Sequence, residues 1–257
     1  MSNTLMKTID DDEFSISVKN LTKSFKNQKV IENLNLNIHA KEIHGIIGRN
    51  GAEKTTLIES IVGFNEIDQG EIRLLNFDSS INREELMKHI GIQPQVANLL
   101  PRQTVNETIY LFSSFYKETM EPKEIMELLE LTEISAKRVK DLSVGQKQRL
   151  LVALALIGNP SLIILDEPTT GIDPQIRQLI WNVLRGIRNE GCTIVLTTHY
   201  MEEAEKLCDR ISILHDKKII VSGTPKEIIN THRKKTSDSL EDVFLYLTGS
   251  NLRKEVD

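Results

Sequence analysis

The chain has 257 residues, of which 39% are hydrophobic and 27% are charged, and its 32 Lys and Arg against 37 Asp and Glu give a formal net charge of -5. A chain of this length and composition can bury a substantial core without disulfide staples. The mild acidity excludes the concentrated positive charge that holds nucleic acid or an acidic membrane surface, so we expect no nucleic-acid partner.

The cysteines and the apolar runs also limit the class of protein. Cys192 and Cys208 have no CxxC companion or histidine cluster nearby, so we expect reduced thiols that pack as small hydrophobic side chains. Residues 1–13 form an acidic N-terminal extension, where a signal peptide would need a cationic start and an apolar stretch. The longest apolar run, 150–157, is far shorter than the roughly 20 residues of a membrane-spanning helix. We therefore expect a chain that is neither secreted nor membrane-spanning by itself.

The N-terminal part of the chain predicts strands followed by an α/β unit. Apolar residues alternate over 14–18 and 34–38, which indicates half-buried antiparallel strands. A short apolar run at 42–47, a glycine-containing turn and a helical pattern over 54–62 follow directly. A strand, a tight turn and a helix in this order are typical of the opening of a nucleotide-binding α/β unit.

The rest of the chain predicts a parallel sheet and a group of helices. Short apolar strands at 162–165 and 193–197, with a helical pattern over 174–188 between them, indicate a parallel sheet covered on both faces. Between about residues 96 and 160 strand signals are lacking, and we predict helices at 104–116, 122–131 and 146–157. The fold class is therefore α/β, with an N-terminal antiparallel β subdomain and an inserted α-helical subdomain.

The turn after the first predicted parallel strand carries the side chains of a phosphate-binding loop. In such a loop, backbone N–H groups and a helix N-terminus converge on phosphate oxygens, a lysine reaches the β and γ phosphates, and a hydroxyl binds Mg²⁺. Lys54, Thr55 and Thr56 supply these side chains, but Glu53 stands where the strict motif has glycine. The complete loop is Gly48, Arg49, Asn50, Gly51, Ala52, Glu53, Lys54, Thr55 and Thr56.

Two acids end the apolar strand at 162–165. At the carboxyl edge of a parallel sheet, where ligands of open α/β folds bind, we interpret Asp166 as the residue that holds the magnesium shell. Glu167 is then the general base that polarises a water molecule. The alternative is that both acids only cap the following turn. His199 ends the next predicted strand, where an isolated histidine could also be structural.

A second anion site is predicted where the helix over 146–157 begins. Ser143 and the backbone N–H of Gly145 precede that helix, about 20 residues before Asp166, and a helix N-terminus attracts anions. Ser143 could also serve as an ordinary N-cap. The order of this motif and of the two acids downstream favours the functional interpretation.

From Phe14 to about Gly249 the chain resembles the ATP-binding cassette of an ABC transporter, because the motifs above match that family in identity, order and spacing. The sequence LSVGQ at 142–146 is the most specific of them. The resemblance implies a P-loop NTPase (RecA-like) core, a single cassette over 14–249 with the helical subdomain at about 96–160, and a C-terminal helical extension at 224–257. It also implies that ATP and Mg²⁺ are the cofactors and that the chain hydrolyses ATP.

The resemblance also implies a role for each motif residue. Catalytic roles fall to Glu167, His199 and Gln95, and magnesium-binding roles to Thr55, Gln95 and Asp166. Asp173 corresponds to the acid of the D-loop. The ATP-binding residues would be Phe25, which stacks on adenine, the Walker A residues Gly48, Arg49, Asn50, Gly51, Ala52, Glu53, Lys54, Thr55 and Thr56, and the signature residues Ser143, Gly145 and Gln146.

In that family two cassettes pack head to tail, so that the signature of one covers the ATP on the Walker A loop of the other. We therefore expect a second cassette, most simply a second copy of this chain, and an integral-membrane permease that docks beside Gln95 over residues 96–116. Residues 239–249 (SLEDVFLYLTG) resemble the ending of ATPases that serve ABC-2 type exporters of drugs, antibiotics, peptides or polysaccharides, and for this chain we expect efflux of a drug or an antimicrobial peptide. The expected location is the cytoplasmic face of the cell membrane, reached through the permease.

Glu53 is the main departure from the family pattern. Its charge would repel each negative charge of Mg-ATP by roughly 3 kcal/mol at about 6 Å and an effective dielectric constant near 20, so we predict weak or absent ATP binding. The alternative is that the Glu53 side chain turns outward toward Arg49 or solvent. The competing functions are a nucleotide-impaired cassette that acts as a structural partner and an ABC ATPase outside transport.

Smaller departures fall at predicted surface turns. Lys41 and the turn at 216–218 replace residues that usually include glycine, and Val144 replaces a glycine of the signature. We expect each lysine turn to cost at most about 1 kcal/mol of stability.

Overall fold

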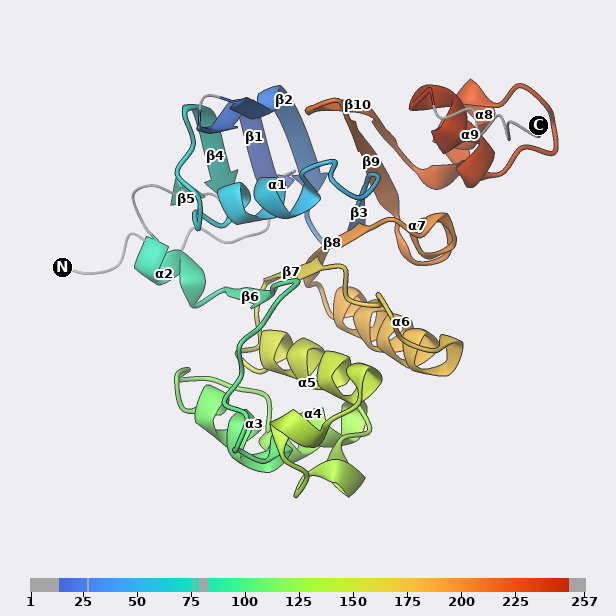
Figure 1. The fold of residues 1–257 in the computed structure, drawn as a ribbon. Coiled ribbons are helices and arrows are strands. Elements are labelled where there is room, and N and C mark those ends of the chain that lie inside the picture. Colours follow the sequence, from blue (N-terminus) through green and yellow to red (C-terminus); the bar gives the residue numbers. More distant parts are fainter. Residues whose placement is uncertain (1–13, 27, 76, 79–82, 250–257) are drawn as a thin grey trace.

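The computed structural model describes residues 14–26, 28–75, 77–78 and 83–249. The predicted N-terminal extension 1–13 and the end of the C-terminal extension lie outside these residues. The described chain forms two sheets with helices packed around them (Figure 1).

The antiparallel sheet confirms the strands predicted near the start of the chain. Its strand order within the described residues is β2-β1-β4-β5, and β1 pairs antiparallel with both β2 and β4. Ile16 and Val18 alternate with more exposed neighbours and are 0% and 1% exposed, as the period of a half-buried strand requires. The strands are β1 (Phe14–Phe25), β2 (Gln28–His39), β4 (Gln69–Leu74) and β5 (Phe77–Asp78).

The core sheet confirms the predicted parallel arrangement. Its order within the described residues is β10-β9-β3-β8-β7-β6, in which β9, β3, β8, β7 and β6 run parallel and β10 is antiparallel to β9. The carboxyl ends of the parallel strands therefore meet at one edge. The strands are β3 (Ile43–Ile47), β6 (Ile90–Gln93), β7 (Leu162–Asp166), β8 (Thr193–Thr198), β9 (Arg210–His215) and β10 (Lys218–Gly223).

The helices follow the predicted ranges with shifts at their ends. One predicted helix, 122–131, stops at Leu128, because Glu130 adopts a left-handed backbone conformation with φ 50°. Another begins at Val144 rather than residue 146, because Ser143 and Gln146 form a capping box. The helices are α1 (Lys54–Ile61), α2 (Arg83–Met87), α3 (Val105–Ser113), α4 (Pro122–Leu128), α5 (Val144–Leu156), α6 (Pro174–Asn189), α7 (Met201–Leu207), α8 (Pro225–His232) and α9 (Leu240–Leu247).

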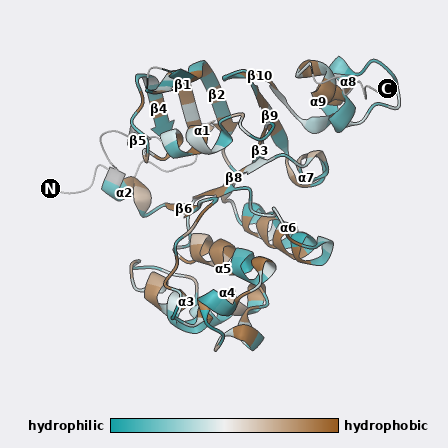
Figure 2. Ribbon diagram, in the orientation of Figure 1, coloured by the Kyte–Doolittle hydropathy of each residue, from teal (hydrophilic) through white to brown (hydrophobic). Residues whose placement is uncertain are grey.

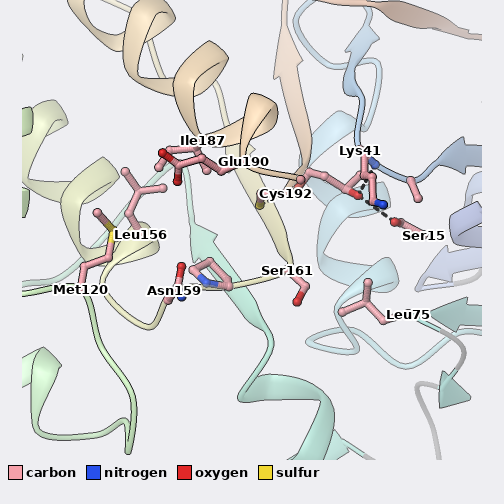
Figure 3. A pocket seen from close by; sticks show the side chains of 14 residues that line it. Ser15, Lys41, Leu75, Met120, Leu156, Asn159, Ser161, Ile187, Glu190 and Cys192 are labelled. Atoms are coloured by element: carbon pink, nitrogen blue, oxygen red, sulfur yellow. Dashed lines mark hydrogen bonds between the residues drawn. The ribbon is translucent and has the colours of Figure 1, made fainter. Parts of the chain in front are cut away.

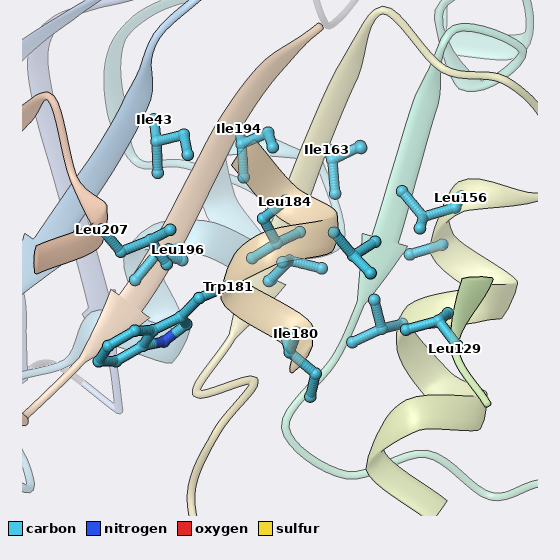
Figure 4. Packing of buried hydrophobic residues seen from close by; sticks show 14 of the residues in the cluster. Ile43, Leu129, Leu156, Ile163, Ile180, Trp181, Leu184, Ile194, Leu196 and Leu207 are labelled. Carbon is cyan, nitrogen blue, oxygen red and sulfur yellow. The ribbon is translucent and has the colours of Figure 1, made fainter. Parts of the chain in front are cut away.

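The two faces of the core sheet bury two separate groups of apolar side chains. On β7, Ile163 belongs to the group shared with the helical subdomain and α6, whereas Ile164 belongs to the group shared with α1 and the antiparallel sheet. Figure 4 shows Leu184 of α6 near Ile163 and Ile194 on this face, with Ile180 farther along the same helix. Figure 2 shows hydrophobic residues along α5, whereas α6 alternates hydrophobic and hydrophilic segments. Side-chain alternation along buried strands thus covers both faces.

The cysteines agree with the prediction of buried thiols. Cys192 and Cys208 are both buried and are not joined in a disulfide. Burial raises the pKa of the Cys192 thiol to about 12, which keeps it in the unreactive thiol form. Within the described ranges, no helix has the length and apolarity needed to cross a membrane.

The lysine-containing turns adopt left-handed backbone conformations, as predicted from the missing glycines. Lys41 has φ 62°, and Asp216 and Lys217, between the paired residues His215 and Lys218, have φ 44° and 68°. Positive φ at both central residues of a two-residue hairpin turn suits glycine or asparagine best.

We predict that Lys217→Gly raises the free energy of unfolding by about 1 kcal/mol relative to Lys217→Ala, because only glycine reaches this conformation without steric cost. The alanine variant controls for the loss of the lysine charge. Urea unfolding followed by circular dichroism measures the difference, and equal midpoints for the two variants would contradict the assignment of strain to this turn.

Candidate functional site

The phosphate-binding loop joins β3 to α1 at the carboxyl edge of the core sheet. A Cβ at Gly48 would lie 2.9 Å from the carbonyl oxygen of Leu214, so the strand packing excludes any larger residue there. Lys54, which is 6% exposed, donates to the carbonyl oxygens of Gly48 at 3.0 Å and Arg49 at 3.3 Å. The loop therefore wraps around the lysine ammonium group and holds it over the sheet edge.

Three of the predicted site residues meet at the end of β7. The Thr55 hydroxyl donates to Asp166 Oδ2 at 2.7 Å and lies 3.4 Å from Gln95 Oε1. Thr197 Oγ1, at the end of β8, donates to Asp166 Oδ1 and accepts the backbone N–H of Glu167 at 2.9 Å. A hydroxyl, an amide oxygen and a carboxylate form the oxygen donor set that Mg²⁺ prefers, so the residues present fit that ion.

Glu167 follows Asp166, and its side chain contacts both Lys54 of the phosphate loop and His199. Its Oε1 lies 3.3 Å from Lys54 Nζ and 3.3 Å from His199 Nδ1, and its Oε2 accepts from the Thr170 hydroxyl at 3.1 Å. The residue has φ 52°, a left-handed conformation that costs a non-glycine residue about 1–2 kcal/mol. These side-chain contacts therefore hold Glu167 in an otherwise unfavourable backbone conformation.

The environment keeps Glu167 in its ionised form. Burial is the largest single influence and acts to raise the pKa of Glu167, but the charges of Lys54 and His199 and the hydrogen bonds from Lys54 and Thr170 together lower that pKa below its usual value. A general base must be unprotonated to accept a proton from water. The pairing thus keeps Glu167 competent as a base at neutral pH.

Glu53 occupies a glycine-like position in the loop. It has φ 63° and ψ 29° at the N-cap of α1, and its Oε2 accepts from the Thr56 hydroxyl at 2.9 Å. The carboxylate is therefore bound to the first turn of its own helix. It lines a cavity of about 180 Å³ together with Asn50, Gly51, Lys54, Thr55, Gln95 and Glu167.

The signature residues lie in the helical subdomain. Ser143 caps α5 by accepting the backbone N–H of Gln146 at 3.3 Å, and Gln146 Oε1 accepts the backbone N–H of Ser143 at 3.1 Å and Lys137 Nζ at 2.9 Å. A Cβ at Gly145 would meet Ile176 only at ordinary contact distance, 3.8 Å. None of these hydrogen bonds reaches the cluster around Asp166, so the structure does not bring the signature of this chain to its own phosphate loop.

The remaining predicted residues also stand outside that cluster. Phe25 ends β1, is 44% exposed, and has Lys23 Nζ 4.8 Å from its ring centroid. Asp173 caps α6 by accepting the backbone N–H of Ile176 at 3.0 Å. Backbone Ala52 donates to the carbonyl of Arg49 at 3.0 Å and so closes the turn of the loop.

Some residues that contact the site were not predicted. Thr197 holds Asp166, Thr170 holds Glu167, and Gln148 Nε2 of α5 donates to the Glu167 carbonyl oxygen at 3.4 Å. Threonine and glutamine are common in loops and helices, and only the position of Thr197 near a strand end, two residues before His199, could have indicated its role.

A separate cavity of about 240 Å³ lies at the opposite edge of the core sheet (Figure 3). Lys41, Ser161 and Cys192, which line it, come just before β3, β7 and β8. Ser15 Oγ and the backbone N–H of Lys41 both hydrogen-bond to Thr193 Oγ1, at 2.8 and 2.9 Å. Because it adjoins the amino-terminal ends of these strands, this cavity is not part of the site around Asp166.

Comparison with known proteins agrees with this geometry. The profile of the family described as ABC transporter matches residues 31–170, which is more than half of the chain. A Nod factor export ATP-binding protein I of Rhizobium etli is 38% identical over 221 residues, which cover 84% of this chain and 70% of that protein.

Solved structures show the same fold. The structure of an ATP-binding subunit of an ABC transporter matches with a TM-score of 0.82 and 26% identity, over 91% of this chain and 99% of that chain. A dimeric post-hydrolysis state of an ATP-binding cassette, bound to ADP and Pi, matches with a TM-score of 0.74 and 29% identity, over 81% and 98% of the two chains. The chain therefore belongs to the ABC transporter family and has the P-loop fold of its ATP-binding cassettes.

Proposed function

We propose that this chain is the ATP-hydrolysing subunit of an exporter and that it works as a dimer on a separate permease. The observation that carries the proposal is the convergence of Lys54, Thr55, Asp166, Glu167 and His199 at one edge of the core sheet. Relatives named as export ATP-binding proteins support the direction of transport.

The phosphate loop would bind the ATP phosphates through its backbone N–H groups and Lys54. The lysine already lies where the loop carbonyls and Glu167 attract it, so binding of phosphate would exchange these partners for a more negative one. Thr55, Gln95 and Asp166 would hold Mg²⁺, which supplies positive charge to the phosphate oxygens. Phe25 would stack on the adenine.

Glu167 would accept the proton of the attacking water. Its side chain is only 9% exposed, and its carboxylate is held by His199 and Thr170, so it has a fixed position and a retained charge. His199 would donate a hydrogen bond toward the terminal phosphate, and Gln95 would orient the water. Catalysis then depends on positioning and electrostatics, as in other phosphoryl transfers.

The partner cassette would complete the site. Ser143 and Gly145 lie at the N-terminus of α5, where the helix dipole and backbone N–H groups attract anions, yet they make no hydrogen bond to the phosphate loop of the same chain. A second copy packed head to tail would bring its signature to this loop. The dimeric assembly of a matched cassette supports this arrangement.

The permease would dock beside Gln95. Large hydrophobic side chains are exposed there, with Val96 76%, Leu100 56% and Phe64 52% exposed, and Phe64, Gln95 and Val96 line a cavity of about 130 Å³. An exposed apolar patch of this kind is typical of a protein interface. Docking would place the chain at the cytoplasmic face of the cell membrane, and the cargo would be a drug or an antimicrobial peptide, as in ABC-2 type systems.

A second candidate function is a nucleotide-impaired cassette that serves as a structural partner. The favouring observation is Glu53, which takes the left-handed conformation of the missing glycine and lines the cavity beside Lys54 and Thr55. Its carboxylate adds negative charge where phosphates would bind. The hydrogen bond to Thr56 is the feature that holds this carboxylate on its own helix.

We predict that Glu53→Gly binds Mg-ATP about tenfold to a hundredfold more tightly than the unchanged chain, because removal of the charge relieves its repulsion from the phosphates. Glu53→Gln is the matched control, because it removes the charge and keeps the side chain. Isothermal titration calorimetry gives the affinities. Equal affinity for all three proteins would show that Glu53 is tolerated and would remove the second candidate function.

We predict that Glu167→Gln lowers the rate of phosphate release by at least about a hundredfold and traps an ATP-bound dimer, because a neutral amide accepts no proton. Size-exclusion chromatography with ATP detects the dimer, and Glu190→Gln, at an exposed helix end, is the control. Hydrolysis by Glu167→Gln at the unchanged rate would contradict the role of Glu167.

The lowered pKa of Glu167 sets the acid limb of the pH profile. The base is active above its folded-state pKa and is lost as the pH falls through that value, which lies below the ordinary carboxyl value of 4.5. Because phosphate would take Lys54 away from Glu167, this pKa describes the ATP-free protein, and we expect no loss of kcat/KM for ATP from this group between pH 7 and about pH 5. A loss of activity within this range that persists in Glu167→Asp would contradict the assignment of the acid limb to Glu167.

A further inference from the structure

A buried carboxyl group lies outside the site and is not used by the mechanism above. Glu203, in α7, is 0% exposed. Its Oε1 accepts two hydrogen bonds, from Thr169 Oγ1 at 2.7 Å and from Trp181 Nε1 at 2.8 Å. Its Oε2 is buried and has no hydrogen-bond partner among the described residues.

The donors come from segments that carry the catalytic residues. Thr169 is two residues after Glu167 and is 1% exposed, and Trp181 belongs to α6, which begins directly after Asp173. Glu203 itself follows His199 by four residues, in the helix that begins at Met201. One carboxyl oxygen thus joins the segment after Glu167, the segment after His199 and the helix between them.

Burial of the Glu203 carboxyl group is energetically unfavourable. Among the described residues, no basic side chain forms an ion pair with Glu203, although its neighbours Glu202 and Lys206 pair with one another at 2.8 Å. Burial of a carboxyl group without a cation, and with one oxygen unpaired, has a desolvation cost that an apolar side chain would not have. The gain must therefore come from the hydrogen bonds to Thr169 and Trp181.

The bond to Thr169 reaches Glu167 through a short turn. The backbone N–H of Thr170 donates to the Glu167 carbonyl oxygen at 3.3 Å, and the Thr170 hydroxyl donates to Glu167 Oε2 at 3.1 Å. Thr169 lies inside this turn, and among the described residues its hydroxyl bonds to Glu203 alone. Loss of the bond to Thr169 would therefore loosen the turn that positions the Glu167 carboxylate. That turn also holds the Glu167 backbone in its unfavourable left-handed conformation.

We propose that Glu203 is a positioning residue for ATP hydrolysis, which fixes the Glu167 turn relative to the His199 helix through Thr169 and Trp181. The proposal rests on the function proposed above. Glu203 touches neither nucleotide nor water in this role. It acts by keeping the base and the histidine, whose side chains lie 3.3 Å apart, in one geometry.

The chain offers matched variants for a test. Glu203→Ala removes both hydrogen bonds, and Thr169→Val removes only the bond to the Glu167 turn while it keeps the side-chain shape. Glu203→Gln retains an oxygen that can accept both donors. Glu205→Gln, at an exposed position of the same helix, is the control for a general effect of charge.

We expect Glu203→Ala and Thr169→Val to lower kcat for ATP by about tenfold or more, because a displaced catalytic group loses rate steeply. KM should change by less than about twofold, since nucleotide binding is untouched. Glu203→Gln should restore most of kcat, and Glu205→Gln should equal the unchanged chain. Unchanged kcat in Thr169→Val, or a loss that appears in KM alone, would overturn the proposal.

Two further measurements do not depend on hydrolysis. Trp181 is the only tryptophan of the chain, so its fluorescence reports on the bond to Glu203 directly and should shift in Glu203→Ala but not in Thr169→Val. Hydrogen exchange at residues 167–170 should become faster in both variants and stay unchanged in Glu205→Gln. If the unchanged chain hydrolyses no ATP, the proposed function fails, while unchanged exchange at 167–170 would separately overturn the role of Glu203.

Discussion

The hydrogen bonds that converge on Asp166 are the constraint on which the rest of the site depends. Asp166 ends β7, and its two carboxylate oxygens accept from Thr55 at the start of α1 and from Thr197 at the end of β8. The parallel register of β7 and β8, which pairs Asp166 with Thr197, brings these groups to one edge. The phosphate loop therefore takes its position relative to the sheet from a single buried carboxylate.

Lys54 supplies the positive charge that offsets the negative groups at this edge of the sheet. The lysine contacts loop carbonyls and Glu167, and this pairing keeps the partly buried glutamate ionised. Glu53 adds a further negative charge to the cavity that this lysine also lines. ATP must therefore compete with Glu167 and overcome Glu53, whereas a cassette with glycine at this position would meet only the first of these obstacles.

Sequence patterns predicted the α/β class, the phosphate loop, the two acids and the helical insertion, because these depend on local periodicity and on motif residues close in the chain. They did not assign β4 or β6, and they missed Thr197, Gln148 and Glu203. Those residues belong to common types and become informative only when distant segments meet, as when Thr169 and Trp181 reach one carboxyl oxygen. The early end of α4 depends on the left-handed conformation of Glu130, which no local signal indicated.

If the oxygen cluster at Asp166 holds Mg²⁺, the ion should strengthen the binding of ATP to this site. The most direct measurement is calorimetric titration with ATP, with and without Mg²⁺. The two proteins compared are the Glu53→Gly variant, in which binding should be strongest, and the double variant that also carries Asp166→Asn. The account predicts that Mg²⁺ strengthens ATP binding to the first protein by at least about tenfold and has little effect on the second. An equal response to Mg²⁺ in both proteins would contradict the central place given to Asp166.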